Sequence, residues 1–455
     1  MTSSPSPITL LHHFQVSLPP DSAPAAAALP LTFFDIVWLP TGPVERLLFY
    51  RFPHPTSHFL SHHLPLLTSS LSRALLLFYP LSGCVSPPRV PSPSPDAKFQ
   101  IRFSPGDSVP LDVAESSEDF DRISGDYPRA FRDLHSMVPR LPIADDGSIP
   151  LMALQITVFP NQGVALGVAV HHVACDDSSS IHFLKSWAAA AIGGHSKESP
   201  ISPPLTDRTA IADPDSLYFK ILAEMQSLQS SAPPSSPPPD LPPELVIASF
   251  AIGQEQIERL KRGTSARSGD GARVSTFIVA CAFAWACLVR AQAWFYSTKK
   301  TAYLLFSVEC RGRLDPLVPA SYFGNCLRPC FVEVGVRDLL NGEGVFAAAE
   351  AIGKAIKGLE EGGVLKGAEG WLQKIISLVP ERPMSIAGSP RYRVYDVDFG
   401  WGKPMKVEMT SIEKTPGTIS MAEGRQGGIE MGLVLPKPEM EAFGACFRDG
   451  LKLLL

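Results

Sequence analysis

The sequence predicts an α/β protein with mixed sheets and two large domains. The chain of 455 residues is longer than one common domain. Strand-like and helix-like periods occur in both halves, and they do not alternate strictly, as the repeated units of a doubly wound parallel sheet would require. A proline-rich segment near the middle separates the two halves.

The composition is that of a globular protein. Hydrophobic residues make up 45% and charged residues 19% of the chain, which supplies apolar material for packed cores and shows no signature of disorder. The 40 basic and 45 acidic residues give a formal net charge of -5, and no basic block is present. This balance argues against nucleic acid as a partner.

Several features predict a cytoplasmic protein without a membrane partner. Met1–Pro20 lacks the charged and continuous apolar regions of a secretory signal. The longest uncharged run, Val274–Val289, lies between Arg273 and Arg290 and falls short of the roughly 20 residues that span a bilayer, so we expect a buried helix. The eight cysteines form no CxxC pair, which argues against a zinc site and against disulfides. We expect a monomer in a reducing cytosol.

Proline-rich stretches mark loops and a domain boundary. They occur at Ser86–Pro95, Ser199–Pro204 and Pro233–Pro243, and the last one cannot continue a helix or a central strand. The predicted division is an N-terminal domain at residues 1–205, a proline-rich crossover linker at 206–243 and a C-terminal domain at 244–455.

Before the linker, periodicity predicts a long helix and three strands. The apolar residues of Thr56–Tyr79 recur at helical spacing. Phe99–Phe103, Leu151–Phe159 and Val164–Val170 are short apolar runs typical of strands. Val164–Val170 is apolar on both faces, so we expect it inside a sheet, followed by a helix through Trp187.

After the linker, the same two periods predict six strands and three helices. The strands are expected at Glu244–Ile252, Ala302–Cys310, Leu327–Val334, Arg393–Phe399, Met405–Ile412 and Ile429–Leu435. The helices are expected at Arg273–Ala291, Val345–Leu359 and Pro438–Leu453.

A polar cluster at the end of Val164–Val170 is the strongest candidate for chemistry. The strand leads directly into His171 and His172, and Asp176 stands four residues after His172. Imidazole has an unperturbed pKa of about 6.5, so a histidine in a cleft can accept a proton from a substrate hydroxyl near neutral pH. Asp176 would either orient that imidazole or pair with a cation and fix the turn. The alternative is that both histidines are hydrogen-bonded structural residues.

The segment Asp398–Pro404 forms a second cluster. It follows an expected strand, turns on Gly400 and Gly402 and stops at a proline. Because it contains no evident nucleophile or base, we expect a structural role, with Trp401 packed and Asp398 paired or capping.

Two further patterns bear on ligand and metal binding. Tyr322–Cys326 lies just after Arg311 and Arg313, whose guanidinium groups suit carboxylates or phosphates. The paired histidines His12-His13 and His62-His63 lack the spacing of metal ligands on a helix face, so we expect no metal site.

Taken together, His172-x-x-x-Asp176 and Asp398-Phe399-Gly400-Trp401-Gly402 resemble the two signatures of the plant BAHD acyltransferase family. The likeness covers essentially the whole chain. Further segments are similar to the anthocyanin and flavonoid glycoside branch of that family, namely Leu29–Ile36, Phe78–Gly83, Tyr322–Cys326 and Ala387–Arg391.

This resemblance implies two similar domains of the chloramphenicol acetyltransferase type, with a solvent channel between them. Donor and acceptor would enter the channel from opposite faces. The histidine of the first motif would deprotonate the acceptor, which attacks an acyl-CoA thioester without a covalent acyl-enzyme. His172 inherits that role by the resemblance.

The resemblance also implies roles for residues around His172. Asp176 would point away from the active site into a salt bridge, for which Arg290 is the expected partner, and the second motif would lie outside the channel. Acyl-donor or CoA contacts are expected from Ser275, Thr276, Asn325, Ser389 and Arg391.

One position departs from the family pattern. Relatives commonly have glycine after the motif aspartate, whereas this chain has Asp177. The extra carboxylate is harmless, or it narrows the geometry of a tight turn, or it repels an anionic acyl group if it faces the channel.

The branch resemblance implies malonyl-CoA as the co-substrate and a sugar hydroxyl, typically the 6-hydroxyl, of a phenolic or flavonoid glucoside as the acceptor. A malonyl carboxylate would need a cation, for which Arg391 and Lys185 are candidates. A hydroxycinnamoyl-CoA donor, acting on a glycoside, alcohol or amine, is the alternative within the class. A catalytically silent binding protein of the same fold is the alternative from another class, and Asp177 motivates it.

Overall fold

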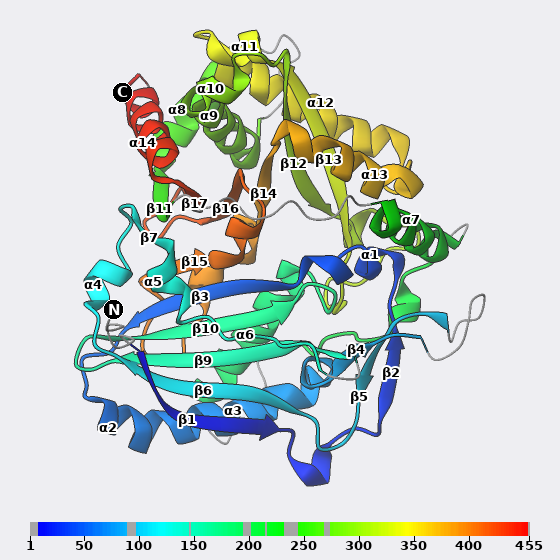
Figure 1. Cartoon of the computed structure of the whole chain (residues 1–455), viewed down its shortest axis with the longest axis vertical. Coiled ribbons are helices and arrows are strands. Elements are labelled where there is room, and N and C mark those ends of the chain that lie inside the picture. The colour runs from blue at the N-terminus through cyan, green and yellow to red at the C-terminus, as the bar shows by residue number, and fades with distance from the viewer. Residues whose placement is uncertain are drawn as a thin grey trace.

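The computed structural model describes residues 8–88, 97–144, 147–193, 202–213, 216–231, 244–267 and 274–453. Two bodies, each built around a sheet, are stacked one above the other (Figure 1). The proline-rich stretch 233–243 and parts of the stretches 86–95 and 199–204 lie outside the described residues. The predicted domain boundaries therefore stay predictions.

The lower body is built on a six-stranded sheet with the order β1-β6-β9-β10-β3-β15. The pairing of β6 with β9 is parallel and the other pairings are antiparallel, so the sheet is mixed, as predicted. Its strands are β1 (Ile8–Ser17), β6 (Ser108–Ser116), β9 (Met152–Phe159), β10 (Gly163–His171), β3 (Pro43–Arg51) and β15 (Lys406–Met409).

Helices α3 (Leu64–Leu77) and α6 (Asp177–Ile192) pack against each other on the face of this sheet that lies behind the strands in Figure 1. The Trp187 indole N–H donates to the carbonyl of Leu67 and to the hydroxyl of Ser70, both at 3.1 Å, which ties the two helices together. Every residue of β9 and β10 is buried, which explains why both strands are predominantly apolar, with Gln155 and Thr157 as buried polar residues of β9. The polar residues that follow β10 are therefore held at the end of a rigid central strand.

A four-stranded sheet, with the order β2-β5-β4-β8, and several short helices complete the lower body. Helix α1 lies near the junction of the two bodies (Figure 1). The strands are β2 (Ala27–Pro30), β5 (Gln100–Phe103), β4 (Cys84–Ser86) and β8 (Ile149–Pro150). The helices are α1 (Phe33–Ile36), α2 (Thr56–His58), a π-helical turn at Phe59–His63, α4 (Phe120–Ile123) and α5 (Phe131–His135).

The upper body is built on a seven-stranded sheet with the order β13-β12-β14-β16-β17-β11-β7. Its strands are β13 (Leu327–Gly335), β12 (Thr301–Glu309), β14 (Met384–Ala387), β16 (Thr418–Glu423), β17 (Ile429–Pro436), β11 (Leu245–Ile252) and β7 (Arg129–Ala130). Its helices are α8 (Gln254–Arg267), α9 (Thr276–Ala291), α10 (Ala293–Tyr296), α11 (Val336–Leu340), α12 (Gly344–Gly362), α13 (Trp371–Leu378) and α14 (Lys437–Lys452).

Helix α9 is the centre of the upper body, where α12 and α14 pack on it. All residues from Val279 to Val289 are buried, which confirms that this uncharged run forms a buried helix. Among the helices in the described ranges, none has the length and apolar content that a bilayer crossing demands.

The two bodies exchange strands. β15 comes from the C-terminal half of the chain and pairs with β3, while β7 comes from the N-terminal half and pairs with β11. The predicted linker is also partly helical, because α7 (Leu217–Ser231) forms within it and packs against α1 and α13. These exchanges tie the bodies together and stabilise the junction between them.

The predicted strand Arg393–Phe399 is wrong. Pro390–Tyr392 and Val394–Asp396 form 3₁₀ turns, and Arg393 between them has a φ of 54°. Val394, Tyr395, Val397 and Phe399 are all buried in the lower core, so their apolar pattern reflects packing of an irregular loop and not a sheet. The other predicted strands and helices are confirmed to within a few residues of their bounds, although only Lys406–Met409 of the segment 405–412 is a strand.

Candidate active site

His171 and His172 leave the central strand at the junction of the two bodies. The backbone N–H of His171 donates to Leu151 at 2.8 Å and that of His172 donates to Gly42 at 3.2 Å. The Nδ1 atom of His171 accepts from the N–H of Val173, and burial lowers the pKa of His171 to about 4. His171 is therefore a neutral structural residue near pH 7.

The imidazole of His172 is held on two sides. Its Nδ1 lies 3.1 Å from Oδ1 of Asn325. The indole of Trp38 is stacked on the ring, with the ring centroids 3.8 Å apart and an angle of 3° between the planes. These contacts define both the plane of the imidazole and its rotation within that plane.

Asn325 determines which nitrogen of His172 carries the proton. Its amide Nδ2 donates to Oδ1 of Asp35 at 3.0 Å and to the carbonyl of His172 at 2.8 Å, so its Oδ1 must be the atom that faces the imidazole. Nδ1 of His172 therefore donates, and Nε2 keeps a lone pair. Within the described part of the chain, Nε2 has no hydrogen-bonding partner.

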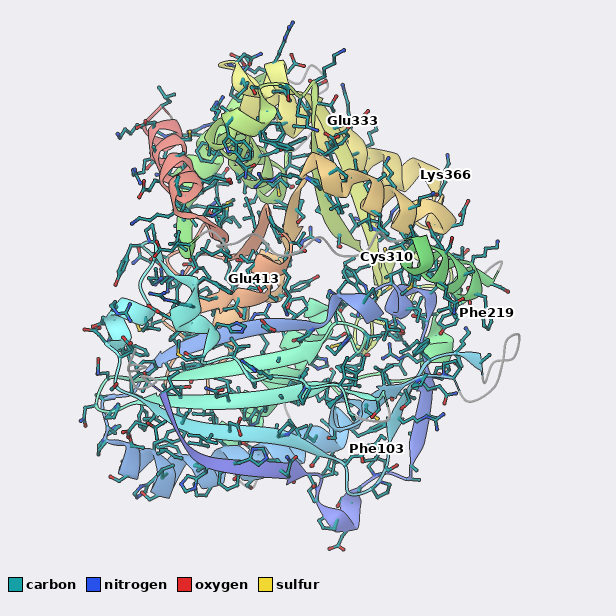
Figure 2. The ribbon with its side chains drawn as sticks, in the orientation of Figure 1. Phe103, Phe219, Cys310, Glu333, Lys366 and Glu413 are labelled. Carbon is teal, nitrogen blue, oxygen red and sulfur yellow. The ribbon has the colours of Figure 1, made fainter. Side chains whose placement is uncertain are left out.

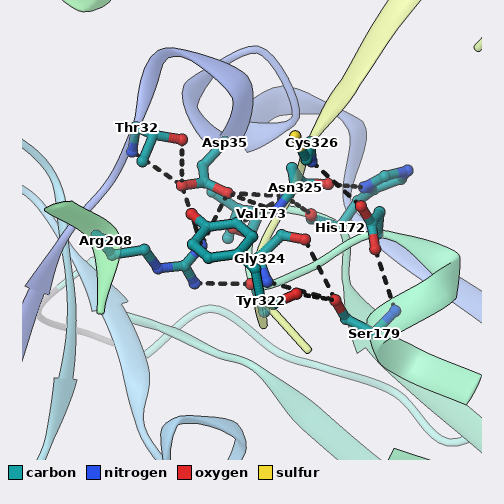
Figure 3. A network of polar contacts seen from close by, with 12 residues as sticks. Thr32, Asp35, His172, Val173, Ser179, Arg208, Tyr322, Gly324, Asn325 and Cys326 are labelled. Atoms are coloured by element: carbon teal, nitrogen blue, oxygen red, sulfur yellow. Dashed lines mark hydrogen bonds and ion pairs between the residues drawn. The ribbon is translucent and has the colours of Figure 1, made fainter. Parts of the chain in front are cut away.

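Asp35 anchors this arrangement to the lower body. It caps α1 by accepting from the backbone N–H and the hydroxyl of Thr32, at 2.8 and 2.7 Å, and it pairs with Arg208 at 3.2 Å. It also accepts from the backbone N–H of Asn325 at 3.0 Å. Figure 3 shows this network running from Arg208 through Asp35 and Asn325 to His172.

The hairpin β12–β13 delivers Asn325 from the upper body. β12 ends at Glu309 and β13 begins at Leu327, so this end of the hairpin carries both Arg311 and Asn325. The adjacent Cys310 lies where the two bodies meet (Figure 2). The site is thus assembled from both halves of the chain.

Opposing effects act on the pKa of His172. Burial lowers it below the ordinary value of a histidine, and this effect is the largest. The charges of Asp176 and Asp177 and the hydrogen bond to Asn325 act in the opposite direction. The imidazole is neutral at pH 7 as a result, while the nearby carboxylates favour the imidazolium once a proton arrives.

Asp176 is a buried structural ion and not an exposed partner of the imidazole. Its carboxylate lies 2.8 Å from Arg311, caps α6 through the N–H of Ser179 at 3.1 Å and accepts from the N–H of Cys326 at 3.1 Å. The predicted partner, Arg290, is wrong, because its guanidinium donates to the carbonyl of Asn341. Arg290 lies at the end of α9 in the upper body, whereas the hairpin turn brings Arg311 to α6.

Asp177 pairs with Arg46, with 2.7 Å between Oδ1 and Nη2. Both side chains line a cavity of about 30 Å³ together with Ser389 and Tyr392. No sequence pattern singled out Arg46, because it lies 131 residues before Asp177 and reaches it only through the pairing of β3 with β10.

The second motif forms a tight loop on the helix-covered side of the lower body. The carboxylate of Asp398 accepts from the N–H groups of Gly400 at 2.7 Å and Gly402 at 3.0 Å. Both glycines have positive φ, at 92° and 88°, a conformation that other residues adopt at a cost. The indole N–H of Trp401 donates to His63 at 3.1 Å, and its ring packs on Tyr50.

The five residues that were expected at the acyl-donor or CoA pocket lie in different parts of the structure. Asn325 contacts His172, and Ser389 lines the cavity beside Asp177. Ser275 is the N-cap of α9, where its hydroxyl accepts from the N–H of Ile278, and Thr276 is the first residue of that helix. Arg391 is exposed.

Lys185, the other predicted cation, donates to the carbonyl of Tyr392 at 2.8 Å. Trp38, which stacks on His172, was not predicted from the sequence, because it belongs to none of the motifs. Across the described ranges, no three His, Cys, Asp or Glu side chains are grouped as metal ligands.

The family model described as the Transferase family matches residues 15–449. The chain is 35% identical to a malonyl-coenzyme A:anthocyanin 3-O-glucoside-6''-O-malonyltransferase from Dahlia pinnata, over 98% of each chain. It is also 35% identical to a coumaroyl-CoA:anthocyanidin 3-O-glucoside-6''-O-coumaroyltransferase from Arabidopsis thaliana, over 99% of each chain.

Solved structures show the same fold. The crystal structure of vinorine synthase superposes with a TM-score of 0.66 at 21% identity, covering 96% of each chain. TRI101 of F. graminearum, complexed with ethyl coenzyme A, gives a TM-score of 0.71 at 17% identity, covering 92% of this chain and 97% of that one. The predicted two-part mixed α/β architecture is confirmed by these matches.

Proposed function

Because this chain belongs to the BAHD family of acyl-CoA-dependent acyltransferases, we propose that it transfers an acyl group from coenzyme A to a sugar hydroxyl of a phenolic or flavonoid glucoside. His172 is the general base of the proposed reaction. The observation that carries this assignment is the free Nε2 lone pair of a buried, neutral imidazole whose Nδ1–H is bound by Asn325.

The proposed reaction proceeds in two proton-coupled steps. Nε2 of His172 accepts the proton of the acceptor hydroxyl while the oxygen attacks the thioester carbonyl. The C–S bond then breaks, and the departing thiolate of coenzyme A takes the proton back from the imidazolium. Asp176 and Asp177 stabilise the imidazolium between these steps, because their charges favour the protonated ring.

Malonyl-CoA is the proposed donor. The relative from Dahlia pinnata transfers malonyl groups by its name, and the cavity between Asp177 and Ser389, at about 30 Å³, suits a small group better than an aromatic ring. A hydroxycinnamoyl donor is the second candidate, because the coumaroyltransferase from Arabidopsis thaliana is equally identical to this chain. Both relatives are named for glucoside acceptors, which supports the proposed acceptor class.

The ion pair of Asp177 with Arg46 bears on the non-catalytic alternative. An unpaired carboxylate beside His172 was the reason to consider a silent binding protein. With Arg46 as an ion-pair partner 2.7 Å away, the carboxylate of Asp177 is not an unpaired charge, which supports an active enzyme. Cytoplasmic location and a monomeric state remain predictions, which cell fractionation and size-exclusion chromatography would check.

The test is an activity panel. Purified protein would be incubated with phenolic and flavonoid glucosides and with malonyl-CoA or p-coumaroyl-CoA, while release of free coenzyme A is followed and products are identified by mass. Malonylated glucoside is the expected product. If only coumaroylated product forms, the donor is p-coumaroyl-CoA and not malonyl-CoA. If no coenzyme A is released with either donor, the proposed function is contradicted.

A further inference from the structure

The cavity beside Asp177 lies between the two bodies of the protein. Its walls come from β3, from the start of α6, from the loop after β14 and from strands β15, β16 and β17. A volume of about 30 Å³ holds roughly two water molecules, which is the space that a carboxylate group requires. The lining residues that matter here are Arg46, Asp177, Ser389, Tyr392, Ser420 and Glu430.

Arg46 is a buried cation with unused hydrogen-bonding capacity. The residue is only 4% exposed, and its guanidinium makes one ion pair, from Nη2 to Asp177, among the described residues. A guanidinium has five N–H donors. Its other nitrogens are not among the fully enclosed polar atoms that lack a partner, and Arg46 lines the cavity, so we infer that they are open to it.

The other charged group of the lining is already neutralised. Glu430 lies 3.1 Å from Lys406 and 3.1 Å from Arg425. Arg46 is therefore the cation that an anionic ligand in this cavity would meet, and Asp177 is the anion already bound to it.

The cavity is close to His172. Asp177 is five residues beyond His172, and its charge raises the pKa of that imidazole. Arg46 stands opposite Val168 in the pairing of β3 with β10, near the end of the strand from which His172 follows. Val168 lies four residues, about 13 Å of extended strand, before His172, and the Arg46 side chain spans part of this distance to reach Asp177. The proposed route takes the far end of an acyl group at His172 toward this guanidinium.

We propose that Arg46 receives the carboxylate of a malonyl donor and that Asp177 competes with this carboxylate for the guanidinium. The pair then determines the selectivity between anionic and uncharged acyl donors. This inference rests on the proposed function. In this arrangement the guanidinium of Arg46 is shared between the carboxylate of Asp177 and the carboxylate of the substrate.

The effect of Arg46 and Asp177 on the binding of a donor carboxylate has a definite sign. A donor carboxylate at Arg46 is attracted by the guanidinium and repelled by Asp177, and in a buried site both effects are strong. Wild-type protein is expected to prefer malonyl-CoA over acetyl-CoA only modestly. Acetyl-CoA is the matched probe, because it lacks the carboxylate and is otherwise the same acyl group.

The experiment measures kcat/KM for malonyl-CoA and for acetyl-CoA with one glucoside acceptor. Asp177→Asn, which keeps the size of the side chain and removes its charge, is expected to raise the malonyl-to-acetyl ratio about tenfold. Arg46→Gln is expected to lower the ratio about tenfold. Because both donors are measured on the same preparation, a partly unfolded variant changes both values and leaves their ratio intact.

Matched controls come from an exposed ion pair between the last residue of β3 and helix α4. Arg51→Gln and Asp121→Asn alter an ion pair whose side chains are 53% and 67% exposed, and both are expected to leave the ratio within about twofold of wild type. A ratio that moves less than twofold in both Asp177→Asn and Arg46→Gln would overturn the inference.

A separate measurement distinguishes failure of the inference from failure of the proposed function. If wild-type protein turns over neither donor, the proposed function fails, and titration calorimetry then tests the pair through the dissociation constants of malonyl-CoA and acetyl-CoA. The affinity for malonyl-CoA relative to acetyl-CoA is expected to rise in Asp177→Asn and to fall in Arg46→Gln. Equal ratios in wild type, Asp177→Asn and Arg46→Gln would overturn the inference independently of turnover.

Discussion

The indole of Trp38 covers one face of the His172 imidazole, with 3.8 Å between the ring centroids and 3° between the planes. Trp38 follows helix α1, whose Asp35 also anchors the partner of the imidazole, Asn325. The same short segment therefore holds the imidazole by stacking and by a hydrogen-bond relay. This arrangement orients the proposed base before any substrate binds.

Trp38→Leu is expected to lower kcat about tenfold with a smaller change in KM, because the imidazole loses its stacking partner while the substrate pockets remain. Steady-state kinetics would check the split between kcat and KM. Trp294→Leu is the matched control, since that tryptophan is 62% exposed, and it is expected to retain wild-type kinetics. An equal effect of both substitutions would contradict a positioning role for Trp38.

Asn325→Ala is expected to lower kcat/KM about 10- to 100-fold, because Nδ1 of His172 loses the acceptor that fixes the tautomer. The hydrogen bond to Asn325 raises the pKa of His172, so its loss lowers that pKa further. The neutral imidazole is the reactive form, and the acidic limb of the pH–rate profile should therefore move to lower pH. A limb that moves to higher pH would contradict the proposed relay.

Stability should fall as the medium is acidified below pH 6.5. His171 has a pKa of about 4 in the folded protein and about 6.5 when unfolded, so the unfolded chain binds the proton first. The stabilisation is complete above pH 6.5 and is lost as pH falls toward 4. His171→Asn should therefore lose about 2 kcal/mol less than wild type between pH 7 and pH 5, measured by urea unfolding. Equal losses would argue against a buried neutral His171.

Breaking the buried pair of Asp176 and Arg311 should destabilise the protein strongly. Asp176→Asn leaves the buried guanidinium of Arg311 with the partly exposed carboxylate of Glu309 as its remaining ion-pair partner, and is expected to cost about 3 kcal/mol in the free energy of unfolding. Glu343→Gln is the matched control, because the pair with Arg267 is exposed and should contribute less than about 1 kcal/mol. Similar midpoints of thermal unfolding for the two variants would contradict the structural role given to Asp176.

Local sequence patterns predicted many of the buried, regular elements, but they missed β3, whose residues Leu47 to Tyr50 are all buried. The continuous apolar runs of β10 and α9 left little choice of structure, and the position of His172 after β10 follows from the strand's end. The irregular loop around Arg393 was predicted wrongly, since buried side chains at irregular spacing imitate a strand.

Contacts between distant segments had no local signal. Arg46 reaches Asp177 through strand pairing, and Arg311 reaches Asp176 through the β12–β13 hairpin, so neither partner could be assigned from spacing. Asn325 was expected near the donor by resemblance, but its bond to the imidazole depends on the meeting of both bodies. Trp38 has no motif, and only the folded chain shows its stacking.

The most direct test of the account is the rate of acyl transfer by His172→Ala, with coenzyme A release and product mass followed on the best glucoside and donor. The control is His135→Ala, which alters an exposed histidine outside the site. We predict a rate about 100- to 10,000-fold below wild type for His172→Ala, with unchanged binding of acyl-CoA, and a wild-type rate for the control. A His172→Ala variant that keeps more than about a tenth of the wild-type rate would contradict the assignment of His172 as the general base.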